Sequence, residues 1–473
     1  MQREWFGLVL AATVFGCGDS GGGTSSASAS DSGTTAGSVS NTDPSTGALP
    51  TTSSASASDT ATTAGSVSAS DTATTSPTAP TTDVSTSSSS ATATDPGTTA
   101  GTTMGVDPDT TAGTTGPVPD LGNPCGGPGE PDVSYIWIAN SDQGTISKIN
   151  TQTLKEEGRY IVRPDQLGSP SRTSVNLTGD VAVANRSGGV AKVYAREESC
   201  VESNGMPGIQ TSKDGNFLPW GVEECVAWFT PMNYTSQRPV AWTAGSFNEN
   251  SCAWENSKLW TSGNNLQNGT VDVLRLNGQT GAIEDTVQVM GVGADYYGLY
   301  GAAVDAKGNM WASQLSQQSL VFVDGQTLQY KVWPMALPGY GMTVDSKGYV
   351  WVCAYQGAGR FDPVTETWQI ANVEGSGGCM EDGNGTLYVS AGAGGIIAVD
   401  TETLAQKQLY PLPEYVHGIS IDYYGYVWGV SIGANAYRVD IMNNGTFDTF
   451  SGLVGAYTYS DMTGVALANV SPQ

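Results

Sequence analysis

Short runs of alternating apolar and polar residues, separated by Gly, Asp and Asn, fill the second part of the chain. In "YGMTVDSKGYVWVCA" (340–354), two runs rich in β-branched and aromatic residues flank the sequence "DSKG". This pattern predicts two antiparallel strands joined by a tight turn, in which the Asp side chain bonds the turn backbone and Gly348 adopts a positive φ. Two further runs follow and end in "TWQIANV", so the pattern indicates four strands in about 40 residues.

This unit recurs along the chain. "YGAAVDAKGNMWASQ" (300–314) and "HGISIDYYGYVWGVS" (417–431) share the scheme Gly, two residues, apolar, Asp, two residues, Gly, two residues, Trp. Aligning all units gives the anchor positions Trp137, Ala182, Trp260, Trp311, Trp351, Tyr388 and Trp428. A repeat of about 40 residues built from short strands is typical of propeller blades. We therefore predict an all-β fold, a seven-bladed β-propeller within residues 121–473.

The two ends of the repeat region are complementary. The unit near Tyr135 lacks its first strand, whereas "DMTGVALANV" (461–470) resembles only a first strand. We expect this C-terminal strand to complete the first blade and close the ring, which leaves no open sheet edge. Between Ala182 and Trp260 the spacing is nearly two units but carries the pattern of one. We interpret residues 197–256 as an insertion, and an eighth blade is the alternative.

One position of the repeat admits two interpretations in the unit that contains Tyr388. A strict alignment places Glu381 where other units have an apolar residue, and a carboxylate buried there would be costly. A one-residue insertion in "EDGNG" would instead make Met380 the apolar residue and Glu381 the acid of the turn. We favour the second alignment.

The first part of the chain has a different composition. Residues 1–17 contain an apolar run from Trp5 to Phe15 that ends at Cys17, which resembles a bacterial lipoprotein signal with Cys17 as the lipidated residue. Residues 18–120 contain Ser, Thr, Ala, Gly and Asp but no Lys, Arg, Cys or aromatic residue. Such a segment cannot bury enough surface to fold, so we expect a disordered tether. The protein is then exported and lipid-anchored to the bacterial cell envelope, at the outer membrane or cell surface.

Six further cysteines fit an exported protein with up to three disulfides. The candidates are Cys125, Cys200, Cys225, Cys252, Cys353 and Cys379, and their spacing matches no zinc site. Cys353 and Cys379 lie on neighbouring units and could pair across blades. In that case Cys125 is left for a cysteine of the insertion.

The repeats, and especially "VHGISIDYYGYVW" (416–428), resemble the seven-bladed propellers of the streptogramin lyases (virginiamycin B lyase-like) over residues 135–470. The resemblance implies an enzyme in which a magnesium ion and a histidine at the axial mouth open a cyclic depsipeptide by elimination. His417, the only histidine, matches the Pro-His-Gly-Ile position of that family, with Val416 in place of the proline.

The acidic positions of the family are missing. Family units often carry Glu three residues after the anchor, where this chain has Asn140, Asn185, Gly263, Gln314, Ala354, Ala391 and Ser431. Magnesium needs hard oxygen ligands, and proton abstraction needs a positioned base. We therefore interpret the protein as non-catalytic, with no metal or other cofactor. The alternative is a carbon–oxygen lyase or a hydrolase that uses Mg²⁺, with His417 as the catalytic residue and Asp295, Glu414 and Asp461 as candidate carboxylates.

The candidate binding site is the axial mouth. The alignment places Tyr300, Tyr340 and His417 at equivalent positions there, with Tyr415 and Tyr297 nearby. Tyrosine offers contact area with a polar end, so we expect the mouth and the insertion to bind a peptide, protein or polysaccharide of the envelope or exterior. The net charge of −26 disfavours nucleic acid. We expect a monomer.

Overall fold

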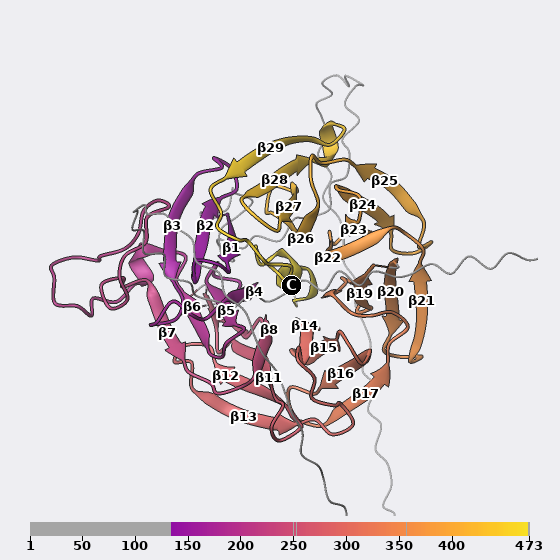
Figure 1. Ribbon diagram of the computed structural model, residues 1–473, viewed down its shortest axis with the longest axis horizontal. Coiled ribbons are helices and arrows are strands. Elements are labelled where there is room, and N and C mark those ends of the chain that lie inside the picture. The colour runs from indigo at the N-terminus through magenta and orange to yellow at the C-terminus, as the bar shows by residue number, and fades with distance from the viewer. Residues whose placement is uncertain (1–133, 249, 252, 356, 472–473) are drawn as a thin grey trace, which may run out of the picture. The chain divides into compact units, whose positions relative to one another are not determined.

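The computed structural model describes residues 134–471 except 249, 252 and 356. Within this part, seven antiparallel sheets follow one another in a ring (Figure 1). Each sheet is a blade, numbered from one to seven in chain order, and the fold is the predicted all-β, seven-bladed propeller. The predicted signal sequence and tether, with Cys17, Cys125 and Cys252, lie outside the described residues. No helix in the described part is long and apolar enough to cross a membrane.

The first three blades use the strands up to residue 288. Blade one contains β1 (Tyr135–Asn140), β2 (Thr145–Asn150) and β3 (Glu156–Ile161). Blade two contains β4 (Pro170–Val175), β5 (Val181–Asn185), β6 (Val190–Val193) and β7 (Val226–Thr230). Blade three contains β8 (Ser236–Trp242), β11 (Lys258–Asn265), β12 (Thr270–Asn277) and β13 (Ile283–Gln288).

The last four blades follow without interruption, and in each the four strands pair in chain order. Blade four contains β14 (Leu299–Val304), β15 (Met310–Gln314), β16 (Ser319–Val323) and β17 (Tyr330–Pro334). Blade five contains β18 (Gly341–Val344), β19 (Val350–Ala354), β20 (Gly357–Asp362) and β21 (Thr367–Ala371). Blade six contains β22 (Gly375–Glu381), β23 (Thr386–Ala391), β24 (Ile396–Asp400) and β25 (Gln406–Tyr410). Blade seven contains β26 (Val416–Ile421), β27 (Val427–Ser431), β28 (Asn435–Asp440) and β29 (Thr446–Ser451), with a short 3-10 helix η2 (Ile441–Asn443) before β29.

The repeated Asp and Trp bond to each other. In blades four, five and seven the Trp ring nitrogen donates to the Asp of the hairpin turn, as in Trp351 to Asp345 (2.7 Å) and Trp428 to Asp422 (2.8 Å). The other oxygen of Asp422 accepts the turn amides of Tyr424 and Tyr426. One carboxylate therefore accepts hydrogen bonds from two turn amides and from the tryptophan ring nitrogen, which explains the fixed spacing between Asp and Trp in the repeat.

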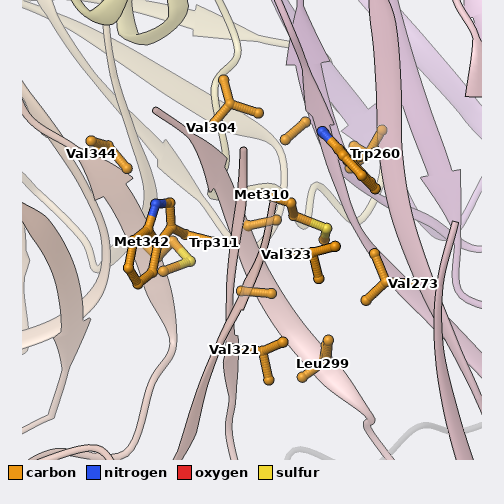
Figure 2. Packing of buried hydrophobic residues seen from close by; sticks show 14 of the residues in the cluster. Trp260, Val273, Leu299, Val304, Met310, Trp311, Val321, Val323, Met342 and Val344 are labelled. Atoms are coloured by element: carbon orange, nitrogen blue, oxygen red, sulfur yellow. The ribbon is translucent and has the colours of Figure 1, made fainter. Parts of the chain in front are cut away.

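All seven anchors lie on the strand next to the innermost one and are buried. They pack between blades, because one sheet cannot cover its own face. Figure 2 shows this in blades three to five, where Trp260 and Val273 approach Leu299 and Met310. The glycine that opens each unit lets inner backbones meet closely. A Cβ on Gly418, for example, would collide with the carbonyl oxygen of Thr458.

The ring is closed by residues 454–463, which we call the closing segment. The Trp137 amide donates to the Met462 carbonyl (2.9 Å), and the Tyr457 amide donates to the Ala139 carbonyl (3.2 Å). The Asn140 side chain accepts a bond from the Val454 amide (2.9 Å). The C-terminal part of the chain thus takes the innermost place of blade one, as predicted, but residues 454–463 do so instead of the expected strand within 461–470.

The end of the chain differs from the expected strand. The closing segment makes only one regular bridge to β1, and residues beyond it form α1 (Val465–Val470). Gly464 has a φ of 91°, which turns the chain away from the strand direction, and Asp461 accepts the amides of Thr463 and Gly464. The helix contacts β18 and β26 near the centre of the ring (Figure 1).

The segment 197–256 does not form one insertion, contrary to our interpretation. It contains β7 and β8, which belong to blades two and three. The extra residues are a loop between β6 and β7, with the 3-10 helix η1 (Glu197–Ser199), and a hairpin of β9 (Ser246–Asn248) and β10 (Ala253–Glu255) between β8 and β11. The inner strand β8 reads "SQRPVAW" and lacks the Gly and Asp of the repeat, so the alignment missed it.

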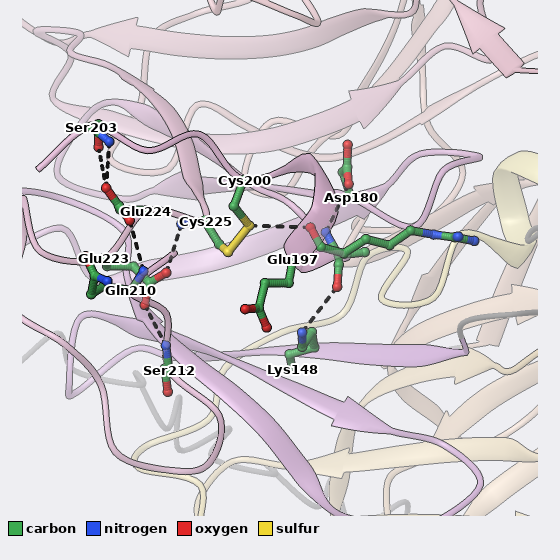
Figure 3. The surroundings of a disulfide bond; sticks show 12 residues. Lys148, Asp180, Glu197, Cys200, Ser203, Gln210, Ser212, Glu223, Glu224 and Cys225 are labelled. Atoms are coloured by element: carbon green, nitrogen blue, oxygen red, sulfur yellow. Dashed lines mark hydrogen bonds between the residues drawn. A yellow bond between two sulfur atoms is a disulfide. The ribbon is translucent and has the colours of Figure 1, made fainter. Parts of the chain in front are cut away.

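Two disulfides join described residues. Cys200 pairs with Cys225 and fastens the loop between β6 and β7 to blade two (Figure 3). Cys353 of β19 pairs with Cys379 of β22 and links blades five and six, which is the cross-blade pair considered above.

Glu381 contradicts the alignment that we favoured. In blades four, five and seven the anchor Trp faces Ala303, Thr343 and Ser420, and in blade six Tyr388 faces Met380. Glu381 therefore occupies the apolar position, and Asp382 accepts the turn amides of Asn384 and Thr386. Glu381 is buried, and burial raises the pKa of its carboxyl. Its oxygens accept the amides of Ser346 (3.1 Å) and Gly385 (3.0 Å), which compensates part of the desolvation cost.

Candidate functional site

The inner strands bring aromatic and cationic side chains together at the end of the ring axis where these strands begin. Tyr300 is at the start of β14, Tyr340 precedes β18, and His417 is at the start of β26. Arg172 of β4 and two tyrosines of the closing segment join them. We call this group the axial cluster, and its members are Arg172, Tyr300, Tyr340, His417, Tyr457 and Tyr459.

Three tyrosine hydroxyl groups meet within the axial cluster. The Tyr300 hydroxyl donates to Tyr340 (3.2 Å) and shares a hydrogen bond with Tyr457 (2.9 Å), and Tyr340 also bonds Tyr457. Burial raises the pKa of Tyr340 and of Tyr457, so these phenols stay protonated at neutral pH. They can donate or accept hydrogen bonds but cannot serve as phenolate bases.

His417 is buried among aromatic rings. Its Nδ1 bonds the Tyr415 hydroxyl (2.8 Å), and its ring lies 4.8 Å from the ring centres of Tyr340, Tyr457 and Tyr459. Nε2 is buried and has no hydrogen-bond partner within the described residues. Desolvation, assisted by the charge of Arg172, lowers the pKa of His417 to about 3. A neutral imidazole with that pKa is a weak base at physiological pH.

Arg172 is the cation of the axial cluster and is fully buried. Its guanidinium lies over the rings of Tyr300 and Tyr459, which are stacked at 5.7 Å, and Nε donates to the Tyr300 carbonyl (3.1 Å). The two terminal nitrogens have no hydrogen-bond partner within the described residues. Burial lowers the pKa of Arg172 to about 9, so the side chain is charged at pH 7. Cation–π contacts provide its stabilisation.

The rim of the axial cluster is half-buried rather than sealed. Tyr340 and Tyr457 are partly accessible, as are Tyr297 and Tyr415 beside them. Tyr297 packs edge-on against Tyr300 and lies under the Arg238 guanidinium. The mouth therefore presents tyrosine edges and hydroxyls around a buried positive charge.

The structure brings Tyr300, Tyr340, Tyr415 and His417 together as the alignment expected. Sequence reasoning missed Arg172, Tyr457 and Tyr459. The first lies in "PSRTSV", which lacks the repeat motif, and the tyrosines lie in the closing segment. The alternation in "GAYTYSD" (455–461) was the one available signal, because it places both tyrosines on one face of an extended segment.

The candidate carboxylates of the lyase interpretation bind other groups. Asp295 accepts the amides of Tyr297 and Gly298, and Glu414 accepts bonds from Asn435 and Tyr437. Asp461 accepts hydrogen bonds from the backbone amides of Thr463 and Gly464, just before α1, and burial raises the pKa of Asp461 to about 6. Among residues 134–471 as described, no group of three or more His, Cys, Asp or Glu side chains is placed to hold a metal ion.

Comparisons with known proteins add little to the geometry. No family model matches the chain, and no curated protein matches it. A solved protein of unknown function from Bacteroides caccae is similar at 11% identity and a TM-score of 0.39, over 59% of this chain and 93% of that chain. A catalytically inactive virginiamycin B lyase from Staphylococcus aureus, solved with quinupristin, is similar at 11% identity and a TM-score of 0.40, over 60% of this chain and 84% of that chain. Likenesses at this level carry no conclusion about activity.

Proposed function

We propose that this protein is a non-catalytic binding propeller whose axial mouth holds a peptide, protein or polysaccharide partner. The observation that carries the proposal is the half-buried ring of tyrosines around the Arg172 guanidinium, whose terminal nitrogens have no hydrogen-bond partner among the residues that the structure describes. Because Arg172 itself is buried, its positive charge would act at the rim, where the hydroxyls of the partly accessible Tyr340 and Tyr457 can donate to an acidic or carbonyl oxygen of the partner. The tyrosine rim would add contact area at a small cost in side-chain entropy.

The lyase alternative is less well supported by the same residues. An elimination needs a base of suitable pKa and a stabilised negative charge. The pKa of His417 is far below neutrality, and the side chains packed on it are aromatic or, in Arg172, cationic. The sequence resemblance to streptogramin lyases is thus proposed as a likeness of scaffold, and the mouth needs no magnesium or other cofactor for binding.

The expected location is part of the proposal. Lipidation at Cys17 would anchor the protein to the bacterial envelope, and residues 18–120 would act as a tether that lets the mouth reach partners at the outer membrane or cell surface. Disulfides at Cys200–Cys225 and Cys353–Cys379 suit an oxidising, exported environment. We propose a monomer that binds no nucleic acid.

The proposal is tested with the full-length protein as bait for the envelope fraction of its own cells. Cross-linking identifies the bound partner, and titration calorimetry with the purified partner measures its Kd. Tyr297→Ala removes a half-buried ring of the rim, so we expect the Kd to rise about tenfold, the loss of one good contact.

Tyr424→Ala is the matched control. Tyr424 is also half-buried but lies in the turn at the opposite end of β26 from His417. This variant should bind with the wild-type Kd. Equal affinity of the Tyr297 variant and the wild type would exclude the mouth as the binding site.

A further inference from the structure

A cavity separate from the axial cluster lies where blades one and two meet the disulfide-bonded loop. Its volume is about 440 Å³, within the range of about 300–1,000 Å³ that is usual for small-molecule sites. Tyr135, Lys148 and Glu157 of blade one line one part of it, and the loop supplies Glu197 and Cys225. Figure 3 shows Lys148 and Glu197 on the same side of the disulfide.

The charges that line the cavity are balanced. The cavity is lined by equal numbers of cationic and carboxylate side chains, namely Lys148, Arg196, Lys213, Glu157, Glu197 and Glu198. The whole chain, by contrast, has a net charge of −26. Neither a net cation nor a net anion gains a strong advantage in such surroundings, whereas a neutral ligand with many donors and acceptors can bond both signs.

Toward the described part of the chain, two of these side chains use only some of their hydrogen-bonding capacity. The Lys148 ammonium carries three donors, and one of them bonds the Ala195 carbonyl (3.2 Å). Glu157 accepts one bond, from the Tyr135 hydroxyl (2.9 Å). Lys148 is half-buried, and this partial desolvation lowers the pKa of its amine. Neighbouring hydroxyls of one ligand could accept from Lys148 and donate to Glu157.

Aromatic rings provide the remaining surface. Tyr135, Tyr160 and Tyr194 line the cavity, and Lys148 lies 4.9 Å from the centre of the Tyr135 ring. A tyrosine ring offers a flat apolar face beside a polar edge. A pyranose has the same division, with C–H groups on its faces and hydroxyls around its rim.

We propose that this cavity is a binding site for a sugar unit of a neutral glycan. The site is independent of the partner proposed for the axial mouth. Lys148 and Glu157 orient the sugar through its hydroxyls, and the half-buried rings of Tyr135 and Tyr194 contact its apolar face. The Cys200–Cys225 disulfide fixes the loop that completes the site.

The test applies the full-length protein to an array of neutral oligosaccharides, followed by calorimetric titration with a retained oligosaccharide. Lys148→Met and Glu157→Gln keep the side-chain volume while they remove one charged group each. We expect each to raise the Kd about tenfold, the usual loss for one charge-assisted hydrogen bond. In the wild type, the bound oligosaccharide should also protect Lys148 from an amine-reactive label, a measurement that requires no variant.

Lys331→Met and Glu366→Gln are the matched controls, because they change an exposed ion pair elsewhere on the ring. Both should bind with the wild-type Kd, and so should the mouth variant Tyr297→Ala. The proposal is overturned if no neutral oligosaccharide is retained, or if the zwitterion glycylglycine binds more tightly. It is also overturned if Tyr297→Ala abolishes sugar binding while Lys148→Met leaves it unchanged.

Discussion

The backbone amide of Trp137, in the first strand of the described fold, donates to the carbonyl oxygen of Met462, 2.9 Å away. This bond joins blade one to the closing segment. Because β1 would otherwise be an unpaired inner edge, the stability of the ring depends on residues that follow the last blade.

Truncation after Gly452 removes the closing segment and α1. We expect loss of the cooperative thermal transition, since β1 loses its partner and the buried residues Tyr459 and Met462 are removed. Differential scanning calorimetry measures this. A chain that ends at Ser471 is the control and should unfold as the wild type does. A cooperative transition in the shorter chain would mean that the ring is stable while open.

Removal of the cross-blade disulfide should weaken the ring without changing its fold. Cys353 and Cys379 close a loop with a sequence separation of 26, so the double Ala variant should lose about 3 kcal/mol of unfolding free energy. Urea denaturation of the oxidised wild type and the variant measures the difference. A loss of less than about 1 kcal/mol would contradict the expected constraint on the unfolded chain.

The Asp–Trp hydrogen bond should contribute more to the free energy of unfolding than an ordinary turn aspartate does. In Asp422→Ala, the Trp428 ring nitrogen and two turn amides lose their acceptor, and we expect a loss of about 3 kcal/mol in unfolding free energy. Asp362→Ala is the control, because Asp362 serves an exposed turn and should cost less than about 1 kcal/mol. Equal losses in both variants would assign no special role to the bond with tryptophan.

His417 makes stability depend on pH. Its pKa falls from 6.5 to about 3 on folding, so between these values the unfolded chain binds the proton that the folded chain excludes. Stability therefore decreases as the pH falls through this window, by about 2 kcal/mol from this group between pH 7 and pH 5. His417→Gln removes the titration. The variant's deficit relative to wild type should shrink by that amount from pH 7 to pH 5, as measured by urea denaturation at both values.

Two buried carboxyl groups have pKa shifts with the opposite effect on stability, but they do not affect the comparison of the wild type with His417→Gln. Burial raises the pKa of Asp422 and of Asp461 to about 6, so each carboxyl lowers stability as the pH rises through about 4 to 6. Both groups are present in the wild type and in the variant, so their contributions cancel in the difference. A deficit that stays constant with pH would mean that the pKa of His417 is the same in the folded and the unfolded chain.

The repeat could be predicted from sequence because one local chemical device recurs. In blades four, five and seven an Asp that bonds both the turn and a tryptophan fixes the spacing between them, and the other anchors could be aligned to these three units. The strands β7 and β8 carry no such device. β7 pairs with β6 across the disulfide-bonded loop, and β8 pairs with β11 across the β9–β10 hairpin, so the extra residues interrupt the repeat pattern at both pairings.

Only part of the axial cluster could be predicted from the sequence, because only some of its residues belong to the repeat motif. Tyr300, Tyr340 and His417 occupy aligned positions, and therefore their meeting could be expected. Arg172 and Tyr459 reach the cluster from a strand without the motif and from the closing segment, so their approach depends on ring closure. Glu381 was misassigned because an apolar pattern gives no reason to expect a carboxylate held by one backbone amide of the neighbouring blade and one of its own turn.

The bond between Trp137 and Met462 also orders events during synthesis. During synthesis β1, β2 and β3 are made before the other blades, but their inner neighbour, the closing segment, is made only after blade seven. Until the ribosome has added residues 454–463, the first sheet is incomplete and the nascent polypeptide cannot close the ring. The closing segment thus decides when the molecule can become native.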